Sequence, residues 1–535
     1  MASTNPPVDG GKIPLGIDQI PLRVYFAILV NVAERFSYYG LTVPFQNFVQ
    51  NSYQSGDKER PGVLGLGQAA ATAVVNGYFC FQTIMSLAGA VAADGWMGRY
   101  KLLVICSLTY MLGNIILVAI STPAAIEADA APAGFVISLI LIAIGSGGFQ
   151  SVVSAFIGDQ YIGSKQAVIT RKDGTVYMPD KDLTLQYIYN LNYWGLNLGS
   201  ISGVATTFLE LHYGFWAAFL LPLCGLWIAP AALIIGRKAF IRTTPKESAL
   251  LNKSKAFARL AKQRMRSKRN TSEADDSAGD VEDMESVQKV LEICRVLLIF
   301  IVIWVCVGQM TSNFIAQAGQ MQTNGLPNDL TWFANPIMVV LLMPIVQWFL
   351  TSVTGRYHIP FGPMARITVG CVFLALAMAY QAVLQKLIYS AGPCYEYPTQ
   401  CAASGGGGPN DISVWLQLPS YFLIGLSEVL AVSTGYKYAY SAAPESMKSL
   451  VQAIFLLSAG AGALICLAIA PTARNPNLVV MWACIAGTMF LATVVFAAVY
   501  WKQDRRIRLE EATPFDQGVI GPAEPEEKRV PDKTP

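Results

Sequence analysis

A polar motif near the beginning of the chain, Asn-Val-Ala-Glu-Arg-Phe-Ser-Tyr-Tyr-Gly, combines side chains that could bind ions or a polar ligand, and it interrupts an apolar run. If the run is helical, with about 100° between successive residues, Asn31, Glu34, Arg35, Tyr38 and Tyr39 fall within one arc of about 140°. A charged side chain at the centre of a bilayer costs about 2.5 kcal/mol or more, so this stripe cannot face lipid. We therefore expect it to face protein or a water-filled cavity.

The adjacent charges of this motif admit two interpretations. Glu34 and Arg35 could neutralise each other inside the protein, or each could be available for a proton or a ligand. Neighbouring helical residues point about 100° apart, which argues against a good ion pair between them. We therefore favour the second interpretation, in which the planar guanidinium of Arg35 is suited to a carboxylate.

A second isolated carboxylate, Glu428, lies in an apolar run and has no basic residue within two helical turns. A buried glutamate without a local partner is either protonated or positioned to receive a cation. Lys437 follows nine residues later and would point to the opposite face of the helix. We interpret Lys437 as a contact at the helix end rather than as a partner of Glu428.

The composition indicates that these residues belong to a membrane protein. Of the 535 residues, 53% are hydrophobic and only 14% are charged, whereas soluble proteins carry about 25% charged residues. The long apolar runs predict an all-α membrane protein with twelve transmembrane helices. The expected spans begin near Leu22, Gln68, Leu102, Gly134, Leu185, Phe215, Val296, Trp332, Ile367, Val414, Leu450 and Leu478.

The basic residues predict how these spans are oriented. Twelve Lys and Arg residues lie between Arg237 and Arg269, in the loop after the sixth span, whereas the loops on the opposite side carry very few. An even number of spans places both termini on one side, and the positive-inside bias makes that side cytoplasmic. Residues 1–19 lack the apolar core of a signal peptide, so we expect the first span to act as its own insertion signal.

The spacing of the spans indicates two six-helix halves. Asp94-Gly-Trp-Met-Gly-Arg-Tyr-Lys101 resembles the loop after the second helix of major facilitator transporters, and Gly355-Arg356-Tyr357 occupies the matching place in the second half. The expected organisation is a cytoplasmic N-terminal segment (1–21), an N-terminal six-helix bundle (22–236), a charged cytoplasmic linker (237–291), a C-terminal six-helix bundle (292–501) and a cytoplasmic tail (502–535). Glycines at 195, 199 and 203, spaced by four residues, predict close helix packing.

Three motifs in this order resemble the signatures of the proton-coupled oligopeptide transporter (POT/PTR) family of the major facilitator superfamily, and loop features resemble its fungal branch. The first is Glu-Arg-Phe-x-Tyr-Tyr-Gly from Glu34, and the second is Tyr193-Trp-Gly-Leu-Asn197-Leu-Gly-Ser200. The third runs from Tyr421 through Glu428 to Lys448. The resemblance covers nearly the whole chain and implies uptake of di- and tripeptides with protons, by rocking of two bundles about a central site.

The resemblance also implies roles for individual residues. Arg35 would hold the carboxylate of a peptide, and Glu428, with Asn335 nearby, would hold its amino terminus. Asn197 would hydrogen-bond the peptide backbone, although it could instead bond a neighbouring helix. The residues expected to bind substrate are Arg35, Tyr38, Tyr39, Gln150, Asn197, Asn335 and Glu428, and those expected to carry protons are Glu34 and Glu428.

The sequence departs from the family pattern at three positions. Asn31 replaces a glutamate, Gln150 replaces a lysine in the Gly-x-Gly-x-x-Lys motif of the fourth helix, and Lys437 stands where relatives usually have an acid. The first two changes remove one charge of each sign, and removing only one partner of a buried ion pair would cost about 3–5 kcal/mol. We therefore hypothesise that Asn31 and Gln150 form a neutral, coupled pair across the first and fourth helices.

These departures leave three functional classes open. The first is a proton-driven di/tripeptide symporter, favoured by Glu428 as an amine-binding anion. The second is a transporter or facilitator of a non-standard solute, such as a modified peptide or nitrogenous metabolite, with weakened proton coupling; Asn31 and Gln150 favour it. The third is a transport-deficient nutrient sensor, for which the long linker is suitable.

Other kinds of chemistry find no support in the sequence. There is no Cys/His cluster with metal-ligand spacing and no nucleotide-binding Gly-x-x-x-x-Gly-Lys-Ser/Thr motif, so we expect no metal, no cofactor and no enzymatic activity. Cys394 and Cys401 lie in an outer loop, where the surroundings outside the cytosol permit a disulfide between them. The expected partners are a peptide, protons and the lipid bilayer, with no nucleic acid. We expect a monomeric multi-pass protein of the plasma membrane, with a vacuolar membrane as the alternative.

Overall fold

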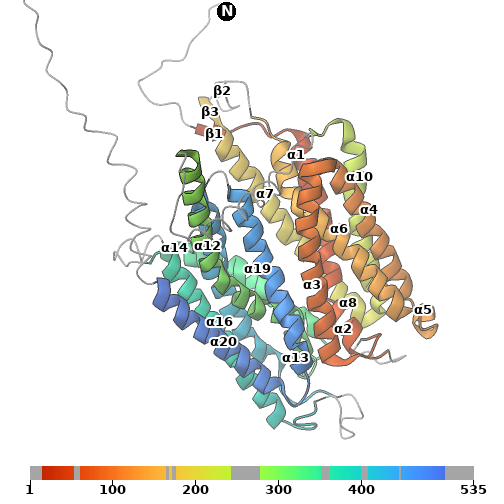
Figure 1. Ribbon diagram of the computed structural model, residues 1–535. Coiled ribbons are helices and arrows are strands. Elements are labelled where there is room, and N and C mark those ends of the chain that lie inside the picture. Colours follow the sequence, from red (N-terminus) through yellow and green to blue (C-terminus); the bar gives the residue numbers. More distant parts are fainter. Residues whose placement is uncertain are drawn as a thin grey trace, which may run out of the picture.

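The computed structural model describes residues 15–53, 61–163, 168–170, 176–242, 278–350, 361–398, 408–444 and 447–500. The chain forms two helical bundles, which are the warm-coloured and the green-to-blue halves of Figure 1. The N-terminal bundle contains α1 (Leu22–Thr42), α2 (Phe45–Gln50), α3 (Gly67–Ala92), α4 (Arg99–Ile120), α5 (Pro123–Glu127), α6 (Ala131–Asp159), α7 (Lys181–Ser200), α8 (Ser202–Tyr213), α9 (Phe215–Leu226) and α10 (Ile228–Ile235), with short turns η1 (Ala93–Met97) and η2 (Gly236–Lys238).

The second bundle is formed by the C-terminal half of the chain. It contains α12 (Ala278–Gly308), η3 (Gln309–Thr311), α13 (Asn313–Ala318), η4 (Asn328–Phe333), α14 (Ala334–Trp348), α16 (Pro363–Ser390), η7 (Val414–Gln417), α17 (Leu418–Ser427), η8 (Glu428–Val432), α18 (Ser433–Ser441), α19 (Lys448–Ile469), η10 (Ala470–Thr472) and α20 (Leu478–Tyr500). Most expected spans begin within about one turn of a helix start. The seventh does not, because α12 already begins at Ala278, inside the stretch expected to be a linker.

Ten helical stretches of the described residues are long and apolar enough to cross a membrane. The two remaining expected spans are helical but more polar, which is why they do not belong to this set. Helix α1 carries the polar stripe of Glu34 and Arg35. The fifth expected span is divided at Ile201 into α7 and α8. The multi-span helical architecture is confirmed, while the count of twelve spans stays an expectation.

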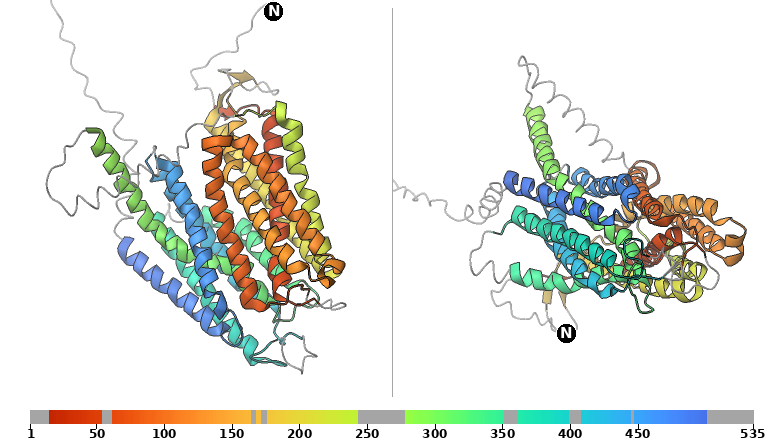
Figure 2. Two further views of the ribbon diagram at one scale, coloured as in Figure 1. Left: turned by 45° about the vertical axis from the view of Figure 1, so that its right-hand side comes forward. Right: turned by 90° about the horizontal axis from the view of Figure 1, so that it is seen from below.

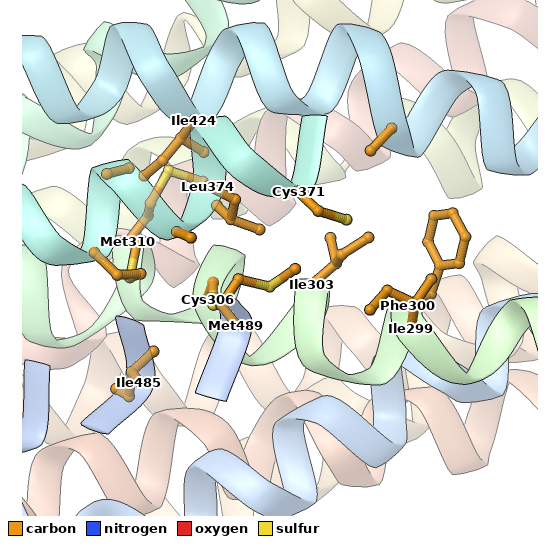
Figure 3. Packing of buried hydrophobic residues seen from close by; sticks show 14 of the residues in the cluster. Ile299, Phe300, Ile303, Cys306, Met310, Cys371, Leu374, Ile424, Ile485 and Met489 are labelled. Carbon is orange, nitrogen blue, oxygen red and sulfur yellow. The ribbon is translucent and has the colours of Figure 1, made fainter. Parts of the chain in front are cut away.

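Each bundle has its own apolar core. In the C-terminal bundle, Figure 3 shows side chains from α12, α16, α17 and α20 interlocking, among them Ile303, Cys371, Ile424 and Met489. A separate cluster, centred on aromatic residues such as Phe45, Phe48 and Phe219, fills the N-terminal bundle. Among the described residues these two clusters are separate, which suits movement of each bundle as a unit.

Small residues bring helices of the N-terminal bundle into close contact, as the glycine spacing predicts. A methyl group placed on Gly199 of α7 would lie 3.0 Å from the backbone nitrogen of Phe36 in α1. One placed on Gly145 of α6 would lie 2.6 Å from the backbone nitrogen of Tyr110 in α4. The first of these contacts holds α1, with its polar stripe, against α7.

A small sheet and an ion pair brace one end of the N-terminal bundle. Strand β3 (Val176–Asp180) pairs in parallel with β1 (Leu15–Ile17) and antiparallel with β2 (Ile169–Thr170), an element that the apolar pattern does not predict. Arg99, at the start of α4, pairs with Asp159 at the end of α6 at 2.7 Å. Gly355-Arg356-Tyr357, the expected counterpart in the second half, lies outside the described residues.

The two bundles approach each other at one end and diverge at the other. Helices α3 and α19 pack against each other, and Figures 1 and 2 show the bundles also meeting near α2, α8 and α13 and separating toward the end that carries the small sheet. The two bundles therefore form a V.

Candidate functional site

A cavity of about 780 Å³ lies between the two bundles. Its lining includes Trp332 in η4 and Asp94 in η1. Its polar and aromatic lining comes from both halves: Tyr38, Tyr39, Asn76, Gln82, Gln150 and Asn197 from the N-terminal bundle, and Trp304, Trp332, Asn335, Glu428 and Gln452 from the C-terminal bundle. A small solute with several polar groups would fit such a space.

Most of the residues expected to bind substrate line this one cavity. Tyr38, Tyr39, Gln150 and Asn197 line one side, and Asn335 and Glu428 line the other. Arg35 is not among the lining residues; its side chain lies against Gln150 and Tyr38 and is 12% exposed. The structure therefore brings together residues that are almost 400 positions apart in the sequence.

The expectation that Glu34 and Arg35 would not pair is wrong. Nε of Arg35 donates to Oε2 of Glu34 at 2.6 Å, and Nη2 donates to Oε1 at 2.8 Å. The 100° rule applies to the Cα–Cβ directions, whereas these two long side chains bend toward each other beyond Cβ. Glu34 is fully buried, so an ion pair is the arrangement that compensates for its loss of water.

Arg35 is engaged on its other side as well. With its amide oxygen turned toward the guanidinium, Gln150 accepts hydrogen bonds from both terminal nitrogens of Arg35. The guanidinium carbon also lies 4.4 Å from the centre of the Tyr38 ring, a favourable cation–π distance. Gln150 thus occupies the position between Arg35 and the cavity, and a neutral amide there avoids placing a second cation beside the guanidinium.

The hypothesis of a direct pair between Asn31 and Gln150 is also wrong. Nδ2 of Asn31 donates to Oδ1 of Asn192 in α7 at 2.8 Å, while Gln150 faces Arg35. The reason is the close contact of α1 with α7, which turns Asn31 toward α7 rather than toward α6. The two departures from the family pattern are therefore satisfied by different partners.

Glu428 and Asn335 form the polar part of the opposite side. Nδ2 of Asn335 donates to both carboxylate oxygens of Glu428, at 3.2 and 3.3 Å. Glu428 begins η8, a five-residue π-helical turn between α17 and α18, and such turns often occur at functional positions. No described residue forms an ion pair with Glu428, so the carboxylate can receive a cationic group from the cavity.

Asn197 and the tyrosines complete the lining. Nδ2 of Asn197 donates to the carbonyl of Tyr193 in its own helix, and no described side chain of a neighbouring helix bonds it. The hydroxyl of Tyr38 donates to Oε1 of Gln82 at 3.3 Å. The ring of Tyr39 lies 5.7 Å from that of Trp332, a contact between the two bundles at the closed end of the cavity.

Several residues that line the cavity are not among those that the sequence predicts for the site. Asn76, Gln82 and Gln452 are amides inside apolar spans, and Trp304 and Trp332 are large aromatic residues near them. A single amide in an apolar helix is a weak signal, because it more often bonds its own backbone, as Asn76 does with Thr72. Only the assembly of the bundles shows that these side chains share one cavity.

The remaining expected residues lie elsewhere. Lys437 is exposed on α18, and its side chain makes no ion pair or hydrogen bond within the described part of the chain. Cys394 is disulfide-bonded, whereas Cys401, its expected partner, lies outside the described residues. No group of three or more possible metal ligands occurs among the described residues.

Comparisons with known proteins agree with this geometry. The sequence model of the POT family matches residues 100–489. Peptide transporter PTR_A of Candidozyma auris is 36% identical over 486 residues, which cover 90% of this chain and 82% of that protein. The probable peptide transporter ptr2 of Schizosaccharomyces pombe is 36% identical over 501 residues, covering 92% and 80%.

A solved structure shows the same fold. The crystal structure of the POT family transporter PepTSo aligns with a TM-score of 0.71 at 22% identity, covering 91% of this chain and 99% of that one. The expected two-bundle architecture is therefore confirmed by a homologous fold as well as by the helices themselves. The family model, the relatives and the fold agree, and the chain belongs to the POT family of membrane transporters.

Proposed function

We propose that this protein takes up di- and tripeptides together with protons by alternating access of two helical bundles. The observation that carries the proposal is the cavity between the bundles, which has the Arg35 cluster behind one side and Glu428 on the other. A dipeptide zwitterion carries one carboxylate and one ammonium group, and these two sides offer a partner of opposite charge for each. The curated relatives are named as peptide transporters, which supports the same substrate class.

The roles of the lining residues follow from their chemistry. The peptide carboxylate would approach Arg35 past Gln150 and Tyr38, and the amino terminus would bind Glu428. Asn335 orients the Glu428 carboxylate through its two hydrogen bonds. Asn197 would offer its amide to the peptide backbone, and Tyr39 would contact the substrate side chains.

The ion pair of α1 supplies a mechanism for proton coupling. Arg35 already donates to both oxygens of Glu34, so a substrate carboxylate has to compete with Glu34 for the guanidinium. Protonation of Glu34 removes its charge and weakens this competition. Proton and substrate carboxylate would therefore bind together, and Glu34 would carry the coupling without help from Asn31, which has no titratable group.

Uptake by liposomes tests this proposal. Purified protein would be reconstituted and given a labelled dipeptide, with and without an inward proton gradient. We expect uptake to rise with the gradient and to lose this response in Glu34→Gln. Glu127→Gln, an exposed carboxylate on α5, is the matched control and should behave like the unchanged protein.

Two results would redirect the proposal. Dipeptide uptake that is indifferent to the gradient would indicate a facilitator. Folded protein that takes up no di- or tripeptide would indicate another solute, such as a modified peptide. Gln150 is the feature that favours the second result, because the amide leaves Arg35 without an additional cation near the substrate carboxylate.

The setting of the protein follows from the same proposal. We place both termini on the cytoplasmic side, so the end with the small sheet faces the cytoplasm and the cavity is open inward. We further propose that the protein works as a monomer in the plasma membrane, transports without catalysing a reaction, and requires no cofactor and no nucleic acid.

A further inference from the structure

A second polar cluster lies at the end where the two bundles meet, away from the cavity. It consists of Asn47 in α2 and Glu210 in α8 from the N-terminal bundle, and of Asn328 and Asp329 in η4 from the C-terminal bundle. Glu210, Asp329 and Asn47 are each 1% exposed. Figure 1 shows α2, α8 and α13 converging at this end.

Amide groups connect the two bundles at this point. Nδ2 of Asn47 donates to Oδ1 of Asn328 at 2.9 Å, and Nδ2 of Asn328 donates back to Oδ1 of Asn47 at 2.9 Å. Asn47 also donates to Oε1 of Glu210 at 2.9 Å. The amides of Asn47 and Asn328 are neutral and do not titrate in the physiological range.

The two carboxyl groups of the cluster lie against each other without enough donors. Helix α8 packs against η4, and Asn47 bonds both Glu210 and Asn328, the neighbour of Asp329, so the two buried carboxyl groups lie close enough to interact with each other. Within the described part of the chain, Oε2 of Glu210 and both carboxylate oxygens of Asp329 lack a well-aligned hydrogen-bond donor, and the N–H groups of Asp329 and Leu330 lie near the Asp329 carboxylate. Two ionised carboxylates only accept hydrogen bonds, so this contact requires a proton on one of them.

No positive side chain among the described residues compensates the pair. Asp329 is the only described charged group that acts on Glu210, and the amides of Asn47 and Asn328 are neutral. His212 lies two residues after Glu210 on α8, but its side chain is exposed and its ring contacts the Phe208 carbonyl. A buried pair of this kind with both carboxylates charged would be strongly disfavoured.

We propose that Glu210 and Asp329 jointly bind one proton, and that this proton holds the two bundles together at the end opposite the open cavity. This inference rests on the proposed alternating access, in which this end has to open to the outside. The bound proton provides a hydrogen bond between α8 and η4. Loss of the proton leaves two negative charges close together across the interface, which favours separation of the two bundles.

The arrangement suits a proton better than a metal cation. Asn47 presents its Nδ2–H₂ group to Glu210, not its oxygen, and its oxygen is used by Asn328. The site therefore offers carboxylate oxygens from only two of the described side chains, fewer than the six or so oxygen ligands that Ca²⁺ or Mg²⁺ prefers.

The contact between α8 and η4 acts as an outer gate, and its closure depends on pH. Opening exposes both carboxylates to the outer solution, and an acidic solution restores the proton and favours closure. One proton linked to closure changes the ratio of closed to open molecules by up to about tenfold per pH unit. The gate would thus close on the substrate more readily when the outer side is acidic.

Distance measurements between spin labels test this. The labels would be attached after Ala128→Cys and Ser390→Cys, which place one exposed label on each bundle near the converging end, in full-length protein without other accessible cysteines. The measurement would be made without peptide, between pH 5 and 9. We expect the long-distance population to grow with pH, at most about tenfold per unit.

Two near-isosteric variants test whether Glu210 and Asp329 are responsible for the pH response. In Glu210→Gln an amide can donate to Asp329, so the interface is satisfied without a proton, and the pH response should disappear with the gate closed. Asp329→Asn is the second variant, in case the first does not fold, and should do the same. Glu127→Gln should keep the full response.

Three outcomes would overturn the proposal: a gate indifferent to pH in the unchanged protein, a response that survives in both variants, or a response that follows sodium or divalent cations instead of pH. Because no peptide is present, these results are independent of the uptake assay. Failure of peptide uptake with an intact gate response would overturn the proposed substrate and leave the proton site standing.

Discussion

Nε and Nη2 of Arg35 hold both carboxylate oxygens of the preceding residue, Glu34, at 2.6 and 2.8 Å. The residue that suits a substrate carboxylate is therefore already paired with a carboxylate of its own chain. Gln150 accepts hydrogen bonds from the terminal nitrogens of the same guanidinium. Binding of a peptide carboxylate becomes an exchange of partners at Arg35, and protonation of Glu34 is the step that favours the exchange.

The pH dependence of uptake should disappear when residue 34 can no longer gain or lose a proton. Lower outer pH favours the protonated form of Glu34 and releases Arg35, so uptake by the unchanged protein should rise as the outer pH falls. Glu34→Gln mimics the protonated form, and its uptake should be flat between about pH 5 and 8. Initial rates of dipeptide uptake, measured with the inner pH held constant, check this. A variant that keeps the full pH dependence would contradict the role of Glu34.

Gln150→Lys should damage the protein more than the loss of the amide does. The lysine would place a second positive charge against the guanidinium of Arg35, where Glu34 is the one carboxylate of the described residues that pairs with it. An uncompensated buried charge costs about 3–5 kcal/mol, so the thermal midpoint and transport should both fall sharply. Gln150→Met removes the hydrogen bonds without adding a charge and should cost only about 1–3 kcal/mol. Equal stability of the two variants would show that Gln150 does not lie against Arg35.

Glu428 should determine the preference for a free amino terminus. Glu428→Gln keeps the shape of the side chain but removes its charge. A hydrogen bond to a charged group contributes about 1.5–3 kcal/mol, so the KM for a dipeptide should rise by about tenfold or more. Uptake of an N-acetylated dipeptide, which has no ammonium group, should change little. If both substrates are affected equally, Glu428 does not bind the amino terminus.

Gly145 should be required for packing in the N-terminal bundle. Gly145→Ala would place a methyl group 2.6 Å from the backbone nitrogen of Tyr110, and overpacking of this kind typically costs about 1–3 kcal/mol. Gly77 of α3 is the matched control, because a methyl group there meets no atom within 4 Å. Gly77→Ala should leave the thermal midpoint unchanged or raise it, since alanine favours helix more than glycine does. Similar midpoints for the two variants would contradict the close approach of α4 and α6.

Much of the fold follows from the sequence because the bilayer imposes it. Apolar runs long enough to cross a membrane have to be helical, and most of their starts agree with the structure within about one turn. The exceptions have local causes. Helix α12 extends back to Ala278 through charged residues, which an apolar pattern does not recognise as helix. The β1–β3–β2 sheet joins short segments far apart in the sequence, and short segments carry little signal.

The sequence alone also determined which residues could do chemistry, because a charged side chain inside an apolar helix is too costly to place against lipid and has to face protein or a cavity. It could not determine their partners. The pairing of Glu34 with Arg35 depends on how two flexible side chains bend, and the separation of Asn31 from Gln150 depends on the contact of α1 with α7. The contact of Glu210 with Asp329 exists only where two bundles meet. Tertiary structure decided these relationships, since each depends on the distance between side chains from packed helices, and such distances follow from the packing of the whole molecule rather than from local pattern.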